Sequence, residues 1–382
     1  MDSLDWSTWL EIDLAAIRNN VSRLRDLSDA AVMAIVKANG YGHGAIPAAQ
    51  AAVEGGAAWC GVSRLEEALA LRHAGLVCPI LVLGYTPPAR LPQAMANQVS
   101  LTVYDPELAA SYVECAREGT GEVRVHVKVE TGMGRLGIDP AKALDLIRYL
   151  REQPGIMVEG IFTHFARADE PDVETTQQQL DRFQKVLDGL KSNGHGLPPM
   201  IHASNSAGAI YFKDARFNLI RVGAAMYGLD PSPRAPLPPD FYPALSWKTR
   251  ITSIKDLSAG HGVSYGSRYI TRKTERIGVI PVGYADGLRR VDHQQVLIHG
   301  ELAPIVGSVC MDQCMVQLDG LPQARLEDEV VVIGRQGNRA ITSEDLARRW
   351  GTINYEVVCG LANRIPRIYL NASGKNQPAF KP

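Results

Sequence analysis

Long apolar runs are missing from this 382-residue chain, and none of its uninterrupted apolar stretches could cross a membrane. The N-terminal segment MDSLDWSTWL lacks the basic stretch and following apolar stretch of a secretory signal. The chain also lacks a basic stripe, and its formal net charge is −1. We therefore expect neither a membrane nor a nucleic acid as a partner.

Cysteine pairs with the CxxC spacing are absent as well. No CxxC pattern occurs, which argues against a zinc site. Scattered cysteines of this kind are typical of free thiols in a reducing compartment, so a cytoplasmic location is expected. The six cysteines are Cys60, Cys78, Cys115, Cys310, Cys314 and Cys359.

Predicted strands and helices alternate through the first part of the chain. Short apolar strands without polar alternation indicate a parallel sheet covered on both faces. Eight strand–helix units in about 200 residues favour a TIM (β/α)8 barrel, and hence the α/β class. An open doubly wound sheet is the alternative, although no GxGxxG motif follows the first strand. The eight strands are predicted at Val32–Val36, Ala58–Val62, Pro79–Leu83, Val99–Val103, Val123–Val129, Met157–Thr163, Met200–Ala203 and Leu219–Val222.

A proline-rich segment, Leu229–Pro243, is the clearest domain boundary. Beyond it, strand patterns dominate, and Ser343–Trp350 is the one clear helix. We therefore predict an N-terminal (β/α)8 barrel over residues 1–236 and a smaller, mainly antiparallel β domain over residues 237–382. The strand predicted at Thr8–Ile12 precedes the barrel and is expected to pair with it.

Two local patterns give further expectations. Ser63 and Glu66 have the spacing of a capping box at the start of a helix that ends near Gly75. Leu245–Ile254 has the pattern of one continuous strand at the start of the second domain.

The segment Ala34–Gly44, AIVKANGYGHG, places a lysine in an unusual position. A short apolar run leads into Lys37, and Asn39, Gly40 and Gly42 then end the strand pattern. Burying an ammonium without a partner is costly, whereas a desolvated lysine can form a Schiff base with a carbonyl. A lysine that extends its amine to solvent from the strand end explains the position as well when Lys37 is considered alone.

Several motifs together resemble those of the alanine racemase family. VKANGYGHG resembles the family's pyridoxal 5'-phosphate attachment motif, and VSYGSRY, SVCMDQCMV, RVGAAMYG and TINYEVVCG resemble further family segments. The resemblance implies a racemase that interconverts L-alanine and D-alanine with this cofactor and supplies D-alanine for peptidoglycan. In GYADGLRR, Leu288 and Arg289 differ from the aromatic–proline pair of the family, a departure that concerns the shape of that loop.

The resemblance assigns two catalytic bases and a set of cofactor ligands. Lys37 and Tyr265 would act on opposite faces of the substrate carbon. Arg221 would donate a hydrogen bond to the pyridine nitrogen, because a guanidinium has no acceptor, and so would keep that nitrogen unprotonated. The implied cofactor-binding residues are Lys37, Tyr41, His164, Ser206, Arg221, Gly223, Ala224 and Tyr355.

Other residues would bind the substrate or support the site. The substrate-binding groups implied are Arg135 and the Met311 amide. Lys128 would be carbamylated and would hold Arg135 in place. The remaining supporting residues implied are Met133, Cys310 and Asp312. In the family, a partner subunit's β domain covers the barrel mouth, which implies a homodimer with shared active sites.

Each residue taken alone also has an ordinary structural interpretation. Ser206 could simply cap a helix, Gly223 could serve a turn, and Lys128 could lie on an exposed strand face. Barrel geometry nevertheless places phosphate sites after the seventh and eighth strands, where Ser206 and Gly223 are predicted to lie.

Several functions stay open beside an alanine racemase. A racemase of broader specificity, or one that acts on serine, would share the fold and motifs. A decarboxylase of the same fold is disfavoured by the VSYG context of Tyr265. A cofactor-binding module without catalysis would lack Tyr265, and a Schiff-base aldolase without cofactor would not explain the phosphate-binding residues.

Overall fold

The computed structural model describes residues 6–119, 121–370 and 376–377. Residues 1–5, on which the expectation of no secretory signal partly rests, lie outside the described residues. In the part of the chain that the structure describes, no helix is long and apolar enough to span a membrane.

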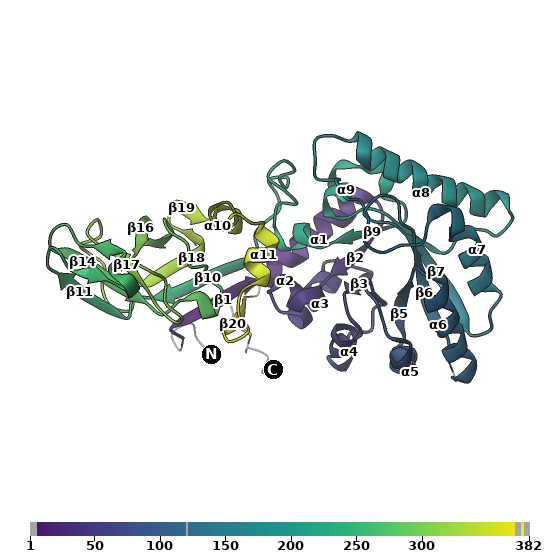
Figure 1. Ribbon diagram of the computed structural model, residues 1–382, viewed down its shortest axis with the longest axis horizontal. Coiled ribbons are helices and arrows are strands. Elements are labelled where there is room, and N and C mark those ends of the chain that lie inside the picture. The colour runs from purple at the N-terminus through teal and green to yellow at the C-terminus, as the bar shows by residue number, and fades with distance from the viewer. Residues whose placement is uncertain (1–5, 120, 371–375, 378–382) are drawn as a thin grey trace. The chain divides into compact units, whose positions relative to one another are not determined.

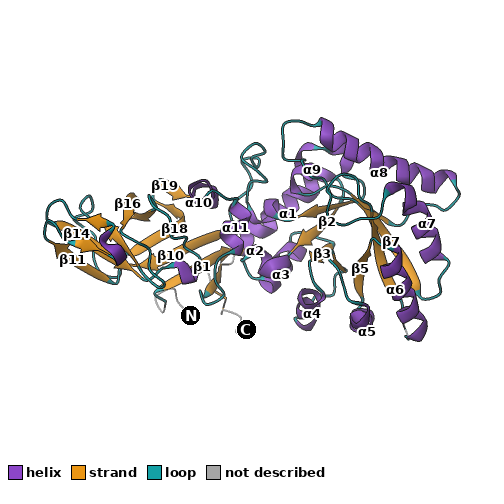
Figure 2. Ribbon diagram, in the orientation of Figure 1, coloured by secondary structure: helices purple, strands orange, loops and turns teal. Residues whose placement is uncertain are grey.

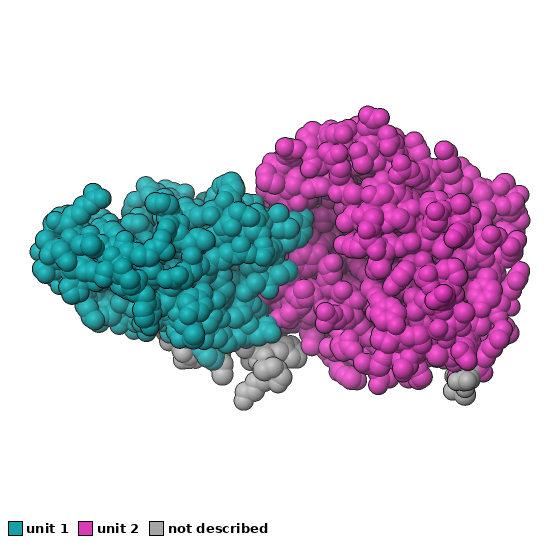
Figure 3. All heavy atoms as spheres, viewed as in Figure 1, with its two compact units in different colours: residues 1–15, 243–382 teal, residues 16–242 magenta. Residues whose placement is uncertain are grey.

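The chain divides into two compact units, one of residues Ala16–Tyr242 and one of Met1–Ala15 with Pro243–Pro382 (Figure 3). The predicted division between residues 236 and 237 differs from this one. The proline-rich segment stays with the first unit up to Tyr242 because the buried Asn20 side chain holds it. Asn20 Nδ2 donates to the Tyr242 carbonyl (2.8 Å), and the Tyr242 amide donates to Asn20 Oδ1 (3.0 Å).

The first unit is the predicted (β/α)8 barrel (Figure 1). Its eight strands are all parallel and follow the order β8-β7-β6-β5-β4-β3-β2-β9. The two end strands approach each other where the Arg221 amide donates to the Ser204 carbonyl (3.0 Å), so the barrel nearly closes. The strands are β2 (Ala31–Ile35), β3 (Trp59–Val62), β4 (Ile80–Val82), β5 (Val99–Val103), β6 (Val123–Lys128), β7 (Ile156–Phe162), β8 (Met200–His202) and β9 (Leu219–Val222).

Helices surround these strands, as Figure 2 shows. The capping box at α4 lies one residue later than predicted. Glu67 Oε2 accepts from the Ser63 and Arg64 amides, because Arg64 and not Ser63 is the N-cap residue. The helices of this unit are α1 (Leu14–Ser28, which begins in the other unit), α2 (Lys37–Tyr41), α3 (Ala45–Glu54), α4 (Leu65–His73), α5 (Leu91–Ala96), α6 (Pro106–Glu118), α7 (Pro140–Arg151), α8 (Glu174–Ser192) and α9 (Ser206–Tyr211).

The lower part of the barrel interior is apolar. Met33, Ile35, Trp59 and Leu81 belong to one buried cluster that fills it. Gly61 also faces this cluster, since a Cβ added there would lie 2.5 Å from Ile35 Cδ1. Odd-numbered residues of β3 therefore point inward, and its even-numbered residues point toward the helix layer.

The second unit is built on an eleven-stranded sheet that is mainly antiparallel. The prediction that the first strand pairs with the barrel was wrong. This strand, β1 (Thr8–Asp13), lies between β10 (antiparallel) and β20 (parallel). An antiparallel partner cannot belong to an all-parallel barrel. The other strands of this sheet are β10 (Leu245–Arg250), β11 (Ser253–Leu257), β14 (Glu275–Ile280), β15 (Gln295–Ile298), β16 (Glu301–Val306), β17 (Cys314–Gln317), β18 (Glu329–Gln336), β19 (Arg339–Ile341), β20 (Arg367–Leu370) and β21 (Asn376–Gln377).

The segment predicted as one strand at Leu245–Ile254 forms two, β10 and β11, and that prediction was wrong. The chain changes its pairing partner between them. The Ile251 amide donates to the carbonyl of Asp328, just before β18, whereas the Thr252 amide donates to the carbonyl of Val279 in β14. Helix α10 (Ser343–Trp350) was predicted correctly, whereas α11 (Asn354–Cys359) was not predicted.

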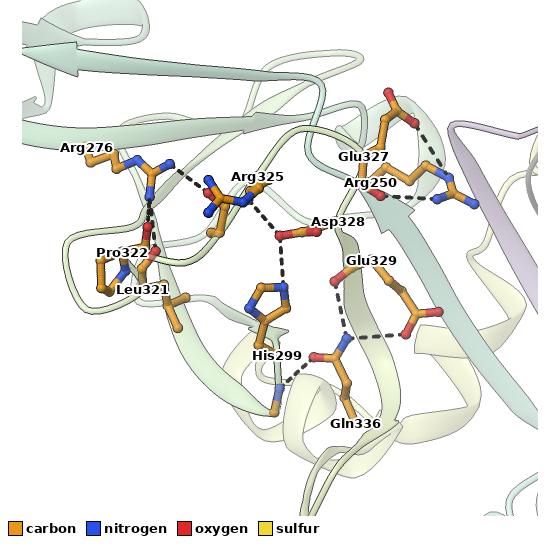
Figure 4. A network of polar contacts seen from close by, with 12 residues as sticks. Arg250, Arg276, His299, Leu321, Pro322, Arg325, Glu327, Asp328, Glu329 and Gln336 are labelled. Carbon is orange, nitrogen blue, oxygen red and sulfur yellow. Dashed lines mark hydrogen bonds and ion pairs between the residues drawn. The ribbon is translucent and has the colours of Figure 1, made fainter.

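A network of polar contacts fixes the loop between β17 and β18 (Figure 4). Arg276 donates to the carbonyls of Leu321, Pro322 and Ala324. Asp328 accepts from the Arg325 amide and pairs with His299. The loop carbonyls thus find donors without regular structure.

Candidate active site

Lys37 lies directly after β2, at the C-terminal end of the barrel strands, where such barrels carry their chemistry. The turn that begins at Lys37 has a left-handed backbone. Ala38, Asn39, Gly40 and Tyr41 have φ angles of 52°, 52°, 61° and 52°. A left-handed turn disfavours side chains with a Cβ atom and costs roughly 1–2 kcal/mol per residue. Backbone strain of this kind is concentrated at functional sites.

Two side chains hold this turn in place. Glu67 Oε1, from α4, accepts from the Ala38 amide (2.7 Å). Asn39 Oδ1 accepts from the Ala45 amide (3.1 Å) at the start of α3. Glu67 also binds the amides that open its own helix, so one carboxylate fixes Lys37's turn to α4.

A group of small residues and hydroxyls lies after β8 and β9. Ser206 Oγ accepts from the Gly223 amide (3.1 Å) and the Ala225 amide (3.3 Å). A Cβ at Gly223 would lie 2.5 Å from Tyr41 Oη, so the Tyr41 hydroxyl packs directly against this glycine. With Ala224 in the same turn, these groups form a cradle of hydroxyls and amides suited to a phosphate.

Arg221 is buried in β9, at the centre of the barrel mouth. Its Nη2 donates to the carbonyls of Thr163 (2.8 Å) and Ala203 (2.9 Å) and contacts His164 Nδ1 (3.1 Å). Burial lowers the pKa of Arg221 to about 9, so the guanidinium is still charged at neutral pH. No carboxylate pairs with Arg221 among the described residues, and none of them accepts from its Nε. An acceptor outside the protein would complete this donor set.

A directed chain of hydrogen bonds leads away from Arg221. Nη1 of Arg221 donates to His202 Nδ1 (2.9 Å), because a guanidinium only donates. His202 Nε2 therefore carries the hydrogen and donates to His126 Nδ1 (2.9 Å). His126 Nε2 then donates to Glu159 Oε2 (3.3 Å), which also accepts from Ser100 Oγ. A carboxylate at the far end thus balances the guanidinium through two neutral imidazoles.

The packing around this series of hydrogen bonds leaves room only for a glycine at position 160. A Cβ at Gly160 would lie 2.2 Å from His126 Nδ1, next to a register shift in the pairing of β6 with β7. On the other side, the Phe162 ring stacks on His202 with centroids 4.7 Å apart. The orientation of both imidazoles is therefore fixed by neighbours on β7.

Cations gather around the mouth of the barrel. Lys128, buried at the end of β6, and Arg221 both lie over the Phe162 ring. Burial, together with the charges of Arg135, Arg221 and Lys37, lowers the pKa of Lys128 to about 8. The uncharged amine of Lys128 is therefore more populated near neutral pH than that of an ordinary lysine, although the charged form still predominates.

Glu130 supplies a carboxylate to this region, but backbone amides occupy it. The amides of Gly132, Met133, Gly134 and Arg135 all donate to it, at 2.5 to 3.3 Å. Although burial raises the pKa of Glu130, these four amides lower it below its ordinary value. The mouth keeps an excess of positive charge, which suits an anionic ligand.

His164 follows β7 and is shared between Arg221 and helix α8. Gln179, buried on α8, donates to the His164 carbonyl (3.1 Å) and accepts from the Ala166 amide (2.8 Å). Burial, followed by the charges of Arg221 and Arg135, holds the pKa of His164 well below its usual range. His164 is thus a neutral acceptor beside the guanidinium.

The remaining predicted residues lie in the second unit, where two loops carry them. Tyr265 follows β12 (Gly262–Val263), and its side chain is 73% exposed. Its carbonyl accepts from Ser308 Oγ (3.2 Å), while Ser264 Oγ donates to the Ser308 carbonyl (2.7 Å) and contacts Cys310 Sγ (3.3 Å).

A third loop and α11 join this group. The Ala285 amide donates to the Met311 carbonyl (3.0 Å). Arg364 pairs with Asp286 and with Asp312, both at 2.7 Å. A Cβ at Gly283 would lie 2.1 Å from the Met311 carbonyl oxygen, so glycine permits this close approach. Tyr355 is half-buried on α11 (Asn354–Cys359).

The predicted site residues therefore form two groups. The barrel mouth brings together Lys37, Tyr41, Lys128, Met133, Arg135, His164, Ser206, Arg221, Gly223 and Ala224. The second unit carries Tyr265, Cys310, Met311, Asp312 and Tyr355. The barrel group offers an amine, a phosphate cradle and a donor without an acceptor, and it fits a phosphorylated pyridine aldehyde.

Sequence reasoning missed Glu67, His126, Glu159 and His202, which hold the site residues in place. A weak signal for two of them exists in the sequence. His126 and His202 lie within predicted barrel strands, and polar residues at such buried positions need partners. The partner Glu159 could not be deduced, because it is the residue of β7 that the register shift leaves unpaired between Val158, opposite Val125, and Gly160, opposite His126.

Comparisons with known proteins cover nearly the whole chain. Residues 12–231 match the family model "Alanine racemase, N-terminal domain", and residues 244–369 match "Alanine racemase, C-terminal domain". An alanine racemase of Symbiobacterium thermophilum is 46% identical over 366 residues, 95% of this chain and 97% of that protein. One of Geobacillus stearothermophilus is 44% identical over 380 residues, 97% of this chain and 95% of that protein.

Solved structures are similar over the same length. The crystal structure of alanine racemase from Bacillus anthracis with bound L-Ala-P has a TM-score of 0.91 and 39% identity. The match spans 98% of this chain and 97% of the chain in that crystal structure. The structure of alanine racemase from E. faecalis has a TM-score of 0.92 and 40% identity, with coverage of 96% and 99%.

The buried histidines predict how stability depends on pH. Burial, followed by the charge of Arg221, holds the pKa values of His164 and His202 well below the ordinary value of about 6.5. Below about pH 6.5 the unfolded chain binds protons that the folded protein does not, so the free energy of unfolding should fall as the pH falls. Each histidine contributes a slope of up to about 1.4 kcal/mol per pH unit, and none above pH 6.5.

Urea unfolding between roughly pH 5 and 8 measures this dependence. His202→Gln should reduce the slope, and His73→Gln, at an exposed position, should not. Equal slopes in wild type and His202→Gln, or a protonated His202 in the nitrogen NMR spectrum at pH 6, would contradict the assignment.

Proposed function

The chain belongs to the alanine racemase family, and on that premise we propose that it interconverts L-alanine and D-alanine with pyridoxal 5'-phosphate as cofactor. The observation that carries the proposal is Arg221, a buried cation without a carboxylate partner among the described residues and with a donor to spare. It suits a ring nitrogen that accepts a hydrogen bond.

When bound, pyridoxal 5'-phosphate delocalises the electron pair left on the substrate carbon after its proton is removed. Lys37 holds the cofactor covalently, and its strained turn fixes where the amine points. Tyr41, Ser206 and the amides of Gly223 and Ala224 bind the phosphate, with Tyr355 as a further donor. These groups keep the ring in one orientation against Arg221.

Arg221 limits how far the ring withdraws electrons. Because a guanidinium cannot accept a hydrogen bond, a pyridine nitrogen bound to Arg221 would have to accept one and would stay unprotonated. The chain through His202 and His126 to Glu159 keeps the guanidinium charged and oriented. A carbon acid that is activated only moderately favours return of the proton over competing reactions, which suits a racemase better than a decarboxylase.

Racemisation requires a base on each face of the substrate carbon. We assign these roles to Lys37 and Tyr265: each removes the proton from one enantiomer and returns one to form the other. Arg135 and the Met311 amide bind the substrate carboxylate, and Cys310, Asp312 and Met133 support the loops that carry these groups. Ion pairing of Asp312 with Arg364 is consistent with that supporting role.

We propose further that the enzyme is a homodimer with shared sites and that it acts in the cytoplasm. Tyr265 is 73% exposed within its own unit, as a residue that serves a neighbouring chain would be. The cysteines of the chain are free thiols, as is typical of proteins in a reducing compartment. D-Alanine made there would supply peptidoglycan synthesis.

Lys128 is proposed to carry a carbamate. A partly neutral amine reacts with carbon dioxide, and the resulting anion would lie among the charges of Lys37, Arg135 and Arg221, which lower the pKa of Lys128. It would replace a cation by an anion where positive charge is in excess, and it would orient Arg135.

The first prediction tests the activity itself. Purified protein with added cofactor should absorb visible light and convert L-alanine to D-alanine, as measured by chiral chromatography across a panel of L-amino acids. Lys37→Ala should lose both properties, because it removes the covalent link and one base. Conversion of serine faster than alanine would make the chain a serine racemase, and release of carbon dioxide would make it a decarboxylase.

The second prediction concerns the carbamate. With ¹³C-bicarbonate present, the wild type should show one protected carbamate signal in its carbon NMR spectrum. Lys128→Ala should lose the signal and up to roughly 100-fold in activity through misplacement of Arg135. Lys142→Ala, at an exposed lysine, is the matched control and should keep both. A signal that survives in Lys128→Ala would refute the assignment.

The third prediction tests the shared site by mixing two inactive variants, Lys37→Ala and Tyr265→Phe. Random exchange of subunits in a two-fold dimer gives about half heterodimers, each with one intact site and one doubly damaged site. Activity should return to roughly a quarter of the wild-type level. Heterodimers that form, as shown by native mass spectrometry, without any recovery would place both residues in the site of one chain.

A further inference from the structure

Two cysteines lie next to each other on the outer face of the barrel. Cys60 is the second residue of β3, and Cys78 comes two residues before β4, the neighbouring strand. Their Sγ atoms are 3.6 Å apart. Trp59 and Gly61 face the barrel interior, so Cys60 between them points outward. Strand β4 begins near Cys78, so the pair lies toward the end of the barrel opposite Lys37.

The two thiols differ in access to solvent. Cys60 is fully buried. Cys78 is partly exposed and lies between Val77, which is 94% exposed, and Pro79, which is also exposed. A small oxidant therefore reaches Cys78 before Cys60. Cys60 can then react only with the oxidised sulfur of Cys78 beside it.

A fixed positive charge lies beside the pair. Arg72 donates to the carbonyls of Leu76 and Cys78, both at 2.7 Å, and to those of Asn97 (2.9 Å) and Gln98 (3.2 Å). Four carbonyl partners hold the guanidinium on the backbone of Cys78 itself. A thiolate at Cys78 is therefore stabilised by a charge that cannot move away.

The electrostatics separate the two sulfur atoms in the same sense. The hydrogen bond from the Cys60 thiol, and then the charge of Arg72, lower the pKa of Cys78 to about 7, against the effect of burial. The same hydrogen bond, followed by burial, holds the pKa of Cys60 well above its ordinary value. Cys78 is thus the thiol that ionises first, and its thiolate can then only accept a hydrogen bond from the Cys60 thiol across the same Sγ–Sγ contact.

We propose that Cys60 and Cys78 form a redox modification site, in which a hydroperoxide oxidises the dithiol to an intramolecular disulfide. The Cys78 thiolate attacks the terminal hydroxyl oxygen of the hydroperoxide, the O–O bond breaks, and a sulfenic acid forms, while the leaving hydroxide or alkoxide takes a proton from solvent and departs as water or an alcohol. The sulfur of Cys60 then attacks the sulfenic sulfur, an S–S bond forms, and water leaves with the Cys60 proton. Two electrons pass to the peroxide, and a thiol reductant reverses the change.

The site is independent of the proposed function, because neither cysteine belongs to the barrel mouth. A disulfide here would link β3 to the segment that opens β4 and close a loop around α4. It should raise the midpoint of thermal unfolding, since it constrains the unfolded chain. Lys37 and its cradle are not touched by either sulfur atom.

The chain itself supplies convenient peptides for the test. Trypsin releases Cys60 in residues 38–64 and Cys78 in residues 73–90, each as the single cysteine of its peptide. Reduced holoenzyme is treated with hydrogen peroxide, quenched with iodoacetamide and digested. Mass spectrometry then measures the linked pair 38–64/73–90, which lies about 2 Da below the sum of the two reduced peptides. Dimedone added during the reaction traps sulfenic acid.

Wild type should yield the linked peptides and lose them again with dithiothreitol. Cys359→Ser, at an exposed cysteine, is the matched control and should behave like wild type. Cys60→Ala should leave Cys78 labelled by dimedone, and Cys78→Ser should leave Cys60 unlabelled. Wild type in urea should form the link at least tenfold more slowly.

Three outcomes would overturn the proposal. One is a wild type in which Cys78 is oxidised no faster than Cys359. Another is a link that joins other cysteines instead, and the third is a link that forms equally fast in urea. Racemase activity, measured in the same samples, distinguishes failure of this proposal from failure of the proposed function, because the linkage is read by mass alone.

Discussion

The buried guanidinium of Arg221 is the feature on which the interior of the barrel depends. A full charge in a protein interior is tolerated only when its donors are satisfied and its field is balanced. Carbonyls of Thr163 and Ala203 take two donors, and a chain of two imidazoles carries the influence of Glu159 to a third. These partners come from β7, β8 and β6, so the charge also fixes how those strands meet. Removing one partner would leave a buried charge or a buried acceptor uncompensated, and both are costly. The same arrangement leaves Nε of Arg221 without an acceptor among the described residues.

The charge of Arg221 is balanced by the distant carboxylate of Glu159, and this differs chemically from a direct ion pair. A carboxylate in contact with Arg221 would occupy the donors that the ligand needs. Glu159 instead lies at the end of the chain, beyond two neutral imidazoles, where it also accepts from Ser100. Each neutral imidazole accepts one hydrogen bond and donates the next. The guanidinium only donates, so it sets the direction of every hydrogen bond in the series. Glycine at position 160 is part of this solution, because a Cβ atom would occupy the place of the His126 ring. The barrel interior thus has an apolar lower layer and a polar layer beneath the mouth.

The sequence contained enough to predict the barrel, its eight strands and the residues at the strand ends, because apolar runs and breaking residues alternate regularly. It did not contain what depends on pairing between distant segments. Strand β1 joins the second sheet because its register fits β10 and β20, and nothing within Thr8–Ile12 encodes that choice. Glu159 reaches His126 from the one position of β7 that a shift in register leaves unpaired. Residues that touch the ligand carry recognisable motifs, whereas residues that hold them are defined by packing. That is why Lys37 and Arg221 were predicted and Glu67 and His202 were not.

Backbone strain marks the turns that carry the two proposed bases, a feature that motifs alone do not show. Lys37 opens a turn in which Ala38, Asn39 and Tyr41 have positive φ angles, and Tyr265 lies between two positive-φ positions, Ser264 and Ser267. None of these is glycine, so each conformation costs free energy that packing elsewhere must supply. The two turns lie in different units and have different supports: Glu67 and Asn39 for the first, and Ser308 for the second. Relaxed turns would leave both side chains free to rotate. A base that exchanges a proton with one face of a carbon atom must keep its position in both directions, and we propose that the supports of these two turns hold Lys37 and Tyr265 in place for that role.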